Sequence, residues 1–228
     1  MSERAEPRIS LNQLTEYLVA NSTGRKSIIR QQKYPKSFQV IYYQDAQDAI
    51  QQFIAGGMSK EEILASRIDD IYSRSTASKY EHTRSISNAE AIDSFLQFYE
   101  NIDLADLAPS IAPDDQPKLR IGEINISVRP EIILNGDHKR YGQVVGGIKL
   151  YLVKRDTARL DNELGKYPSS ILYNYLGQQN PNRRPLHQSC IIVDVFGKKQ
   201  FSAPRTHKKI LAHVRVACEE IADRWKHI

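Results

Sequence analysis

The chain has 228 residues, of which 40% are hydrophobic and 26% are charged, as in ordinary globular proteins. It contains no run of about 18 apolar residues and no apolar N-terminal segment. We therefore expect a cytoplasmic protein that is not secreted and has no membrane partner. The formal net charge of +5 favours anionic partners such as nucleic acid.

The cysteines and histidines give no sign of a zinc site. Cys190 falls in an expected buried strand and Cys218 in an expected helix, which predicts two reduced core thiols. The histidines are scattered, and none pairs with a cysteine at zinc-ligand spacing.

The first half of the chain has helical periodicity. Ser10, with Gln13 three residues later, predicts the start of a first helix. A longer helix is expected over residues 38–54, ending at a glycine pair. The same Ser-x-x-Glu capping pattern at Ser59 and at Ser87 predicts two more helix starts, the second opening a helix over residues 87–103. The polar stretch 73–84 between them reads as a loop.

A basic segment follows the first helix and closes at Pro35. One interpretation is a helix that contacts nucleic-acid phosphates, or part of a helix-turn-helix. The other is a solvated basic face without a partner. The residues concerned are Arg25, Lys26, Arg30, Lys33 and Lys36.

Residues 108–117 contain three prolines and two aspartates and read as a linker. This predicts a division into a helical region, residues 1–108, and a mixed β-sheet core with a C-terminal helix, residues 117–228. The helix over residues 87–103 would pack on that core.

Beyond the linker the hydrophobic period changes to two. Residues 119–128 predict one strand with a bulge near Gly122, and residues 132–134 predict a second strand that ends in a turn at Asn135-Gly136. Residues 144–153 predict a third strand, buried on both faces. A helix over residues 160–176 must kink at Pro168 or begin near Gly165. Two further strands, residues 190–196 and 200–203, precede a final helix that starts after Pro204 and ends near Trp225.

This order predicts an α+β fold in which three strands form an antiparallel meander. The helix that follows would bring the next strand back in parallel. Pro130-Glu131 precedes the second strand, and Lys149 lies within the third. A carboxylate and an ammonium on adjacent strands are what metal-assisted phosphodiester cleavage uses.

These features resemble the PD-(D/E)XK nuclease superfamily over residues 87–196, with Pro130-Glu131 at the proline–acid position and Lys149 at the lysine. The resemblance implies a restriction-endonuclease-like mixed sheet with an αβββαβ core, after an N-terminal helical region. It also implies that Glu131 holds Mg²⁺ or Mn²⁺ and that Lys149 positions the nucleophile or stabilises phosphate charge. The acid expected two residues before the lysine is absent, because that position is Gly147.

Glu163, on the following helix, is the candidate for the missing catalytic acid and second metal ligand. Glu100 and Glu123 are further acids that could reach the site. Structural interpretations stay open for the same positions: Lys149 could extend to a sheet edge or pair with a buried acid, and Glu131 could be exposed. Asp194, inside an apolar strand, needs a partner such as Lys149.

Three functions are compatible with this interpretation. The first is a divalent-metal-dependent nuclease, or a nuclease-derived subunit, that acts on DNA. The alternative is a catalytically inactive subunit of a larger bacterial defence or mobile-element complex, for example in antiviral defence, which binds nucleic acid or protein partners. A protein-binding adaptor that docks through its N-terminal helices is a third reading. No glycine-rich phosphate loop, nucleophile elbow or paired zinc motif indicates a small-molecule enzyme.

Overall fold

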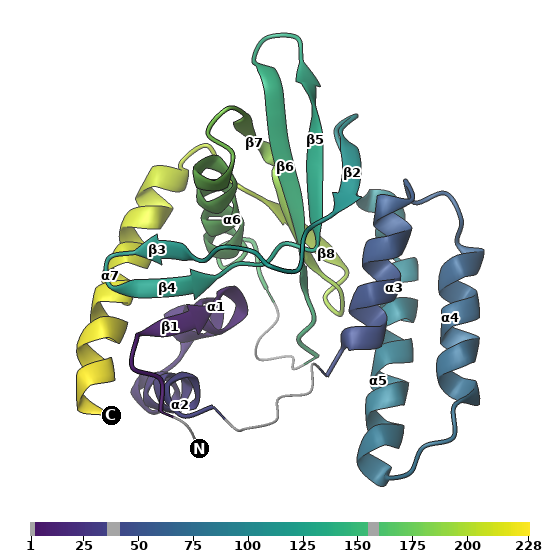
Figure 1. The fold of residues 1–228 in the computed structure, drawn as a ribbon, viewed down its shortest axis with the longest axis horizontal. Helices are drawn as coiled ribbons and strands as arrows, with labels where there is room; N and C mark the ends of the chain where they lie inside the picture. Colours follow the sequence, from purple (N-terminus) through teal and green to yellow (C-terminus); the bar gives the residue numbers. More distant parts are fainter. Residues whose placement is uncertain (1–2, 36–41, 155–159) are drawn as a thin grey trace.

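Residues 3–35, 42–154 and 160–228 are described by the computed structural model, which has a mixed α/β fold (Figure 1). The N-terminal elements are β1 (Arg8–Ser10), α1 (Leu11–Val19), α2 (Ser22–Lys33), α3 (Gln44–Ala55), α4 (Glu62–Ser73), α5 (Lys79–Leu96) and a 3-10 turn, η1 (Tyr99–Asn101). The later elements are β2 (Ala108–Ile111), β3 (Leu119–Ile121), β4 (Ile124–Ser127), β5 (Ile132–His138), β6 (Gly142–Tyr151), α6 (Lys166–Gln179), β7 (Arg184–Asp194), β8 (Lys199–Ser202) and α7 (His207–His227).

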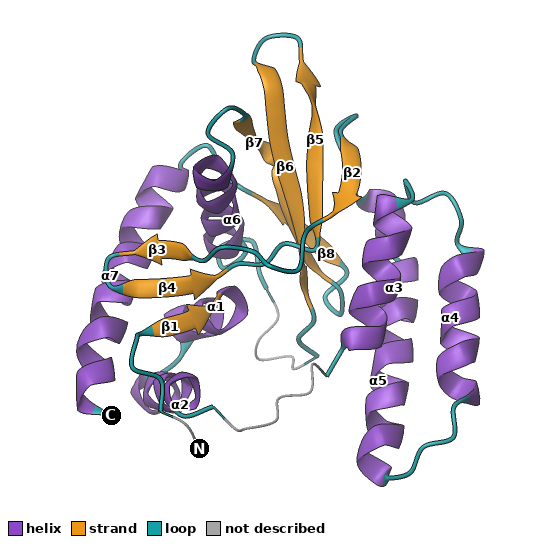
Figure 2. Ribbon diagram, in the orientation of Figure 1, coloured by secondary structure: helices purple, strands orange, loops and turns teal. Residues whose placement is uncertain are grey.

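The described strands form two sheets (Figure 2). The larger has the order β2-β5-β6-β7-β8, and its only parallel pair in the described ranges is β6 with β7. Helix α6 connects these two strands, as expected for a crossover between parallel neighbours. The smaller sheet has the order β1-β4-β3, with β1 parallel to β4.

Strand β6 separates two hydrophobic clusters, because successive side chains of a strand point to opposite faces. Val145 and Tyr151 belong to a cluster formed with α1, α2, α6, α7 and the smaller sheet. Ile148 and Leu150 belong to a second cluster formed with α3, α4 and α5. Figure 1 shows these two groups of helices on opposite sides of the large sheet.

The division at residue 108 therefore does not separate two cores, because residues before it contribute to both clusters. The segment expected to be a linker begins with strand β2, which pairs with β5 at the edge of the sheet. Pro109 is tolerated there, since an edge strand has one side without ladder hydrogen bonds.

The strand expected over residues 119–128 is two strands. Gly122 has φ +58° and turns β3 back onto β4, so this hairpin joins the small sheet with β1. Strand β2 takes the place beside β5 that was expected for residues 119–128.

The hairpin between β5 and β6 also differs from expectation. Asn135 and Gly136 lie within β5, and the turn comes after His138, whose carbonyl accepts a hydrogen bond from Tyr141 N–H at 3.0 Å. At Gly136 a β-carbon would stand 2.6 Å from Leu107 Cδ2, so a larger residue here would have to push the Leu107 side chain aside.

Helix starts were predicted with mixed success. The Ser10 side chain caps α1 by accepting from Gln13 N–H, as expected. Ser59 does not cap α4, and Ser87 lies inside α5, which is capped by Ser78 accepting from Glu81 N–H. Residues expected to be a loop thus form the first turns of α5. The expected start of the helix over residues 38–54 lies outside the described residues.

The C-terminal half follows the sequence more closely. Helix α6 begins after Gly165, which leaves Pro168 in the first turn, where the helix does not use its missing N–H.

Cys190 and Cys218 are buried and unpaired. In the described parts of the chain no helix has the length and apolar character needed to cross a membrane.

Candidate functional site

Glu131 and Lys149 meet where β5 leaves the turn that precedes it. The Glu131 N–H donates to the carbonyl of Ile148 at 2.9 Å, and Ile133 lies opposite Gly147 in the ladder. This register places the Glu131 side chain on the same face of the sheet as Gly147 and Lys149. The expectation that residues 147 and 149 lie on the same face of the strand is therefore confirmed.

The two side chains form a buried ion pair. Lys149 Nζ lies 2.5 Å from Glu131 Oε1, and the Leu150 N–H donates to Glu131 Oε2 at 2.6 Å. The Glu131 side chain is 2% exposed and that of Lys149 is 14% exposed. Of the structural alternatives, pairing of Lys149 with a buried acid is therefore the one observed, and an exposed Glu131 is wrong.

The electrostatics of this pair are dominated by burial. Desolvation raises the pKa of Glu131 above its ordinary value of 4.5, and the Lys149 ammonium and the Leu150 N–H oppose that rise. Removing the lysine would leave this carboxylate buried with one backbone donor, which favours its neutral form.

Gly147 lies in a tight position between β5 and α6. A β-carbon there would stand 3.0 Å from the Ile132 carbonyl oxygen and 3.2 Å from Leu176 Cδ1 of α6. A side chain at the position where the resemblance expects a metal-binding acid would thus have to displace the Ile132 carbonyl of the strand and Leu176 of the helix by a few tenths of an ångström.

Glu163 does not join the pair in the described contacts. Its side chain is 81% exposed and forms an ion pair with Lys166. Glu123 is exposed and pairs with Lys226 at 3.7 Å, and Glu100 is exposed in η1. Within the described ranges no three His, Cys, Asp or Glu side chains gather as a metal site. The described residues therefore do not fit a divalent cation held by Glu131 and Glu163.

The described hydrogen bonds of Asp194 come from backbone N–H groups and not from Lys149. It is fully buried, its Oδ2 accepts from Leu160 N–H at 3.1 Å, and its Oδ1 accepts from Gly197 N–H at 2.9 Å. These bonds fix the end of β7 and the turn into β8.

The basic helix α2 splits into structural and exposed residues. Lys33 is 8% exposed, and its Nζ donates to the carbonyls of Trp225 and Ile228 at the end of α7, at 2.9 and 3.2 Å. Arg25 pairs with Glu220 of α7 at 3.0 Å. Only Lys26 and Arg30 are fully on the surface, and Lys36 lies outside the described residues. Lys33 and Arg25 of this basic segment therefore attach α2 to α7.

The sequence analysis missed a cationic cleft of about 400 Å³ beside Lys149. Arg4, Arg8 and Arg129 line it with Lys149, and its described lining contains no aspartate or glutamate. Arg4 is fixed by its N–H to the Lys33 carbonyl and by its guanidinium to the Gln32 carbonyl, at 2.9 and 3.1 Å. Burial and the neighbouring Arg8 charge lower the pKa of Arg4. No local motif signals this cleft, because its arginines come from distant segments.

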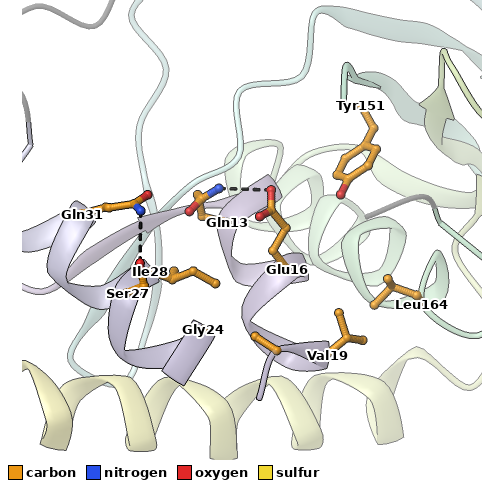
Figure 3. A pocket seen from close by; sticks show the side chains of 10 residues that line it. Gln13, Glu16, Val19, Gly24, Ser27, Ile28, Gln31, Tyr151 and Leu164 are labelled. Carbon is orange, nitrogen blue, oxygen red and sulfur yellow. Dashed lines mark hydrogen bonds between the residues drawn. The ribbon is translucent and has the colours of Figure 1, made fainter. Parts of the chain in front are cut away.

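A second pocket of about 320 Å³ adjoins the cleft and shares Gln13 and Gln31 with it. Figure 3 shows Tyr151, two residues after Lys149 on the same strand, pointing toward this pocket across from α1 and α2. Its lining combines amide and apolar side chains with the carboxylate of Glu16, which accepts from Gln13 Nε2 at 3.1 Å. The cationic cleft next to Lys149 thus adjoins a pocket whose described lining carries one carboxylate and no arginine or lysine.

The sequence was compared with protein-family models and with curated proteins. The chain matches no protein-family model and no curated protein sequence.

Proposed function

We propose that this protein is a nuclease-derived protein that binds nucleic acid, with a phosphate held in the cleft of Arg4, Arg8, Arg129 and Lys149. The observation that carries the proposal is this gathering of four cations, without a carboxylate in the described lining, beside the Glu131–Lys149 pair. Phosphate oxygens favour such sites because arginine donates to them in a fixed planar geometry.

The restriction-endonuclease-like part of the proposal is supported by element order. Helix α5, strands β2, β5 and β6, helix α6 and strand β7 follow one another in the αβββαβ sequence, with β6 and β7 parallel. The β3–β4 hairpin is an insertion between β2 and β5 in this comparison.

In this proposal Lys149 connects the buried ion pair with the cleft. Its ammonium is held by Glu131 on one side and faces the cleft on the other. Glu131 therefore acts as a positioning residue that fixes the lysine and offsets part of its charge. Among the described residues neither Arg8 nor Arg129 forms an ion pair, so in this proposal their guanidinium groups supply most of the attraction for an anion.

A metal-dependent nuclease is the second candidate, because Glu131 and Lys149 lie together on adjacent strands, as the resemblance implies. It requires a further metal ligand beyond Glu131, whose two carboxylate oxygens already accept from Lys149 and Leu150.

The experiment measures binding and cleavage on the same oligonucleotides. Fluorescence anisotropy with labelled duplex and single-stranded DNA, over a salt series, should give an affinity that falls as salt rises. The Arg8→Ala/Arg129→Ala variant should bind with a salt slope reduced by about two, since each phosphate contact contributes about 0.9. Lys26→Ala/Arg30→Ala, a matched loss of two exposed cations on α2, should leave the slope unchanged.

Two results would contradict this proposal. The absence of binding by the wild type at low salt removes nucleic acid as the ligand. Magnesium- or manganese-dependent cleavage that is lost in Lys149→Ala would replace it with the second candidate.

A further inference from the structure

The β5–β6 hairpin projects from the large sheet as a two-stranded ribbon. Strand β2 pairs with β5 only as far as Asn135, and β7 pairs with β6 only from Val144 onward. The pairs Asp137–Gln143 and His138–Gly142 therefore extend beyond both neighbouring strands. Figure 1 shows this hairpin reaching past the rest of the molecule.

The tip of the ribbon and the strand beside it are strongly basic. Lys139 and Arg140 occupy the turn, and Arg183 and Arg184 lie at the start of β7. Asp137 is the one acid of the described ribbon, so four cations face one carboxylate. Among the described residues, none of the four lies within ion-pair distance of a carboxylate, whereas Arg25, Arg67, Arg74 and Arg224 are all paired.

An aromatic side chain orders these cations. The Arg184 guanidinium lies 4.1 Å from the centre of the Tyr141 ring, and that of Arg140 lies 5.4 Å from it. The His138 ring stacks on Tyr141 at 4.7 Å. Arg183 is hydrogen-bonded to Asn135 of β5. Three of the four cations, Arg140, Arg183 and Arg184, thus contact side chains of the ribbon.

We propose that this ribbon is a second nucleic-acid contact, which inserts into the major groove of duplex DNA. That groove is about 12 Å wide and admits a two-stranded β-ribbon, whereas the major groove of A-form RNA is too deep and narrow for side chains to read. The unpaired cations would contact the flanking phosphates. This inference rests on the proposed function and adds the duplex as its substrate class.

The ribbon is a contact separate from the cleft. Lys149 at the cleft comes seven positions after Gly142 at the tip, which corresponds to about 23 Å along a strand. Substitutions at the tip therefore leave the side chains of the cleft in place, and the two sites can be tested independently.

The test compares two charge reversals of equal size. Lys139→Glu/Arg140→Glu should weaken binding to duplex DNA at least tenfold and reduce the salt slope by about two. Lys26→Glu/Arg30→Glu should bind like the wild type. The wild type should prefer duplex DNA to duplex RNA of the same sequence, and guanine N7 methylation of the DNA should interfere with its binding but not with that of the hairpin variant.

Each remaining outcome overturns the inference. Equal weakening by both charge reversals indicates a general charge effect, and equal affinity for duplex RNA excludes the major groove. If the cleft variant weakens binding and the hairpin variant does not, the ribbon proposal alone is wrong. If the wild type binds no nucleic acid, the proposed function is wrong as well. Circular dichroism and urea unfolding of each variant establish that it folds.

Discussion

Leu176 Cδ1 lies 3.2 Å from the position that a β-carbon on Gly147 would occupy. Helix α6 therefore packs directly onto the backbone of β6, two residues before Lys149. Position 147 is where the chain departs from the nuclease pattern, and the side chain that the pattern expects there would press on Leu176 and on the Ile132 carbonyl.

Restoring the pattern should accordingly damage the protein. We expect Gly147→Asp to lower the free energy of unfolding by at least 1–3 kcal/mol, the typical range for overpacking, with an added desolvation cost for the new carboxylate. Urea unfolding followed by circular dichroism measures the change, and a plasmid assay with magnesium should show no cleavage. Gly147→Ala should cost less in a Leu176→Ala background than in the wild type, and equal costs would show that Leu176 is not the obstacle.

Removing the ammonium of Lys149 should destabilise the fold more than removing the whole ion pair. Lys149→Met leaves Glu131 buried and uncompensated, and breaking such a pair costs about 3–5 kcal/mol. Glu131→Gln/Lys149→Met should recover part of that loss, because no charge then remains in the site. Urea unfolding of the single and double variants at neutral pH tests this, and a double variant less stable than Lys149→Met would contradict it.

The raised pKa of Glu131 gives a pH dependence with a definite sign. Between its ordinary value of 4.5 and the higher folded value, the folded protein binds the proton more tightly than the unfolded chain does. This group therefore destabilises the fold progressively as the pH rises through that interval, and contributes nothing below it. The unfolding free energy of the wild type relative to Glu131→Gln should fall with rising pH. A difference that increases with pH would show that Lys149 outweighs burial.

Lys33 should matter for stability and not for ligand binding. Its ammonium satisfies two carbonyls at the C-terminal end of α7, where a positive charge also complements the helix dipole. We expect Lys33→Met to cost about 1–3 kcal/mol, the usual range for leaving buried polar groups without partners. Lys26→Met, on the exposed face of the same helix, should stay within about 0.5 kcal/mol of the wild type.

Arg129 should show opposite effects on stability and on binding. Its φ of +47° is in the left-handed region, which costs a non-glycine residue about 1–2 kcal/mol. Arg129→Gly relieves that strain and Arg129→Ala does not, while both remove the same cation from the cleft. We expect both variants to lose DNA affinity equally and the glycine variant to be the more stable. Unequal affinities would show that backbone shape, not charge, controls binding.

Local patterns in the sequence were reliable where near neighbours form the structure. Ser10 caps its helix through Gln13, three residues away, and Pro168 limits where α6 can begin. Alternation along β6 places Gly147 and Lys149 on one face, and the strand before it brings Glu131 alongside. Each of these relationships joins residues within one element or one hairpin.

The same patterns failed where a distant contact competes with them. A capping motif occurs at Ser59, Ser78 and Ser87, but of these three only Ser78 caps a helix. Ser87 does not, because it lies inside α5, whose residues Ala89, Ala91 and Ile92 are buried. Asn135-Gly136 is a strong turn signal, yet both residues lie within β5, where Asn135 pairs with Ala108 and Val145 and Gly136 pairs with Val144.

The cationic cleft could be found only in three dimensions. Arg8 reaches it because β1 pairs in parallel with β4, more than a hundred residues later in the chain, and Arg129 follows β4 directly. The sequence shows which residues can be buried or paired with their neighbours, since helix and strand periods are local. Which surfaces face each other depends on chain topology, and topology alone assembled these arginines beside Lys149.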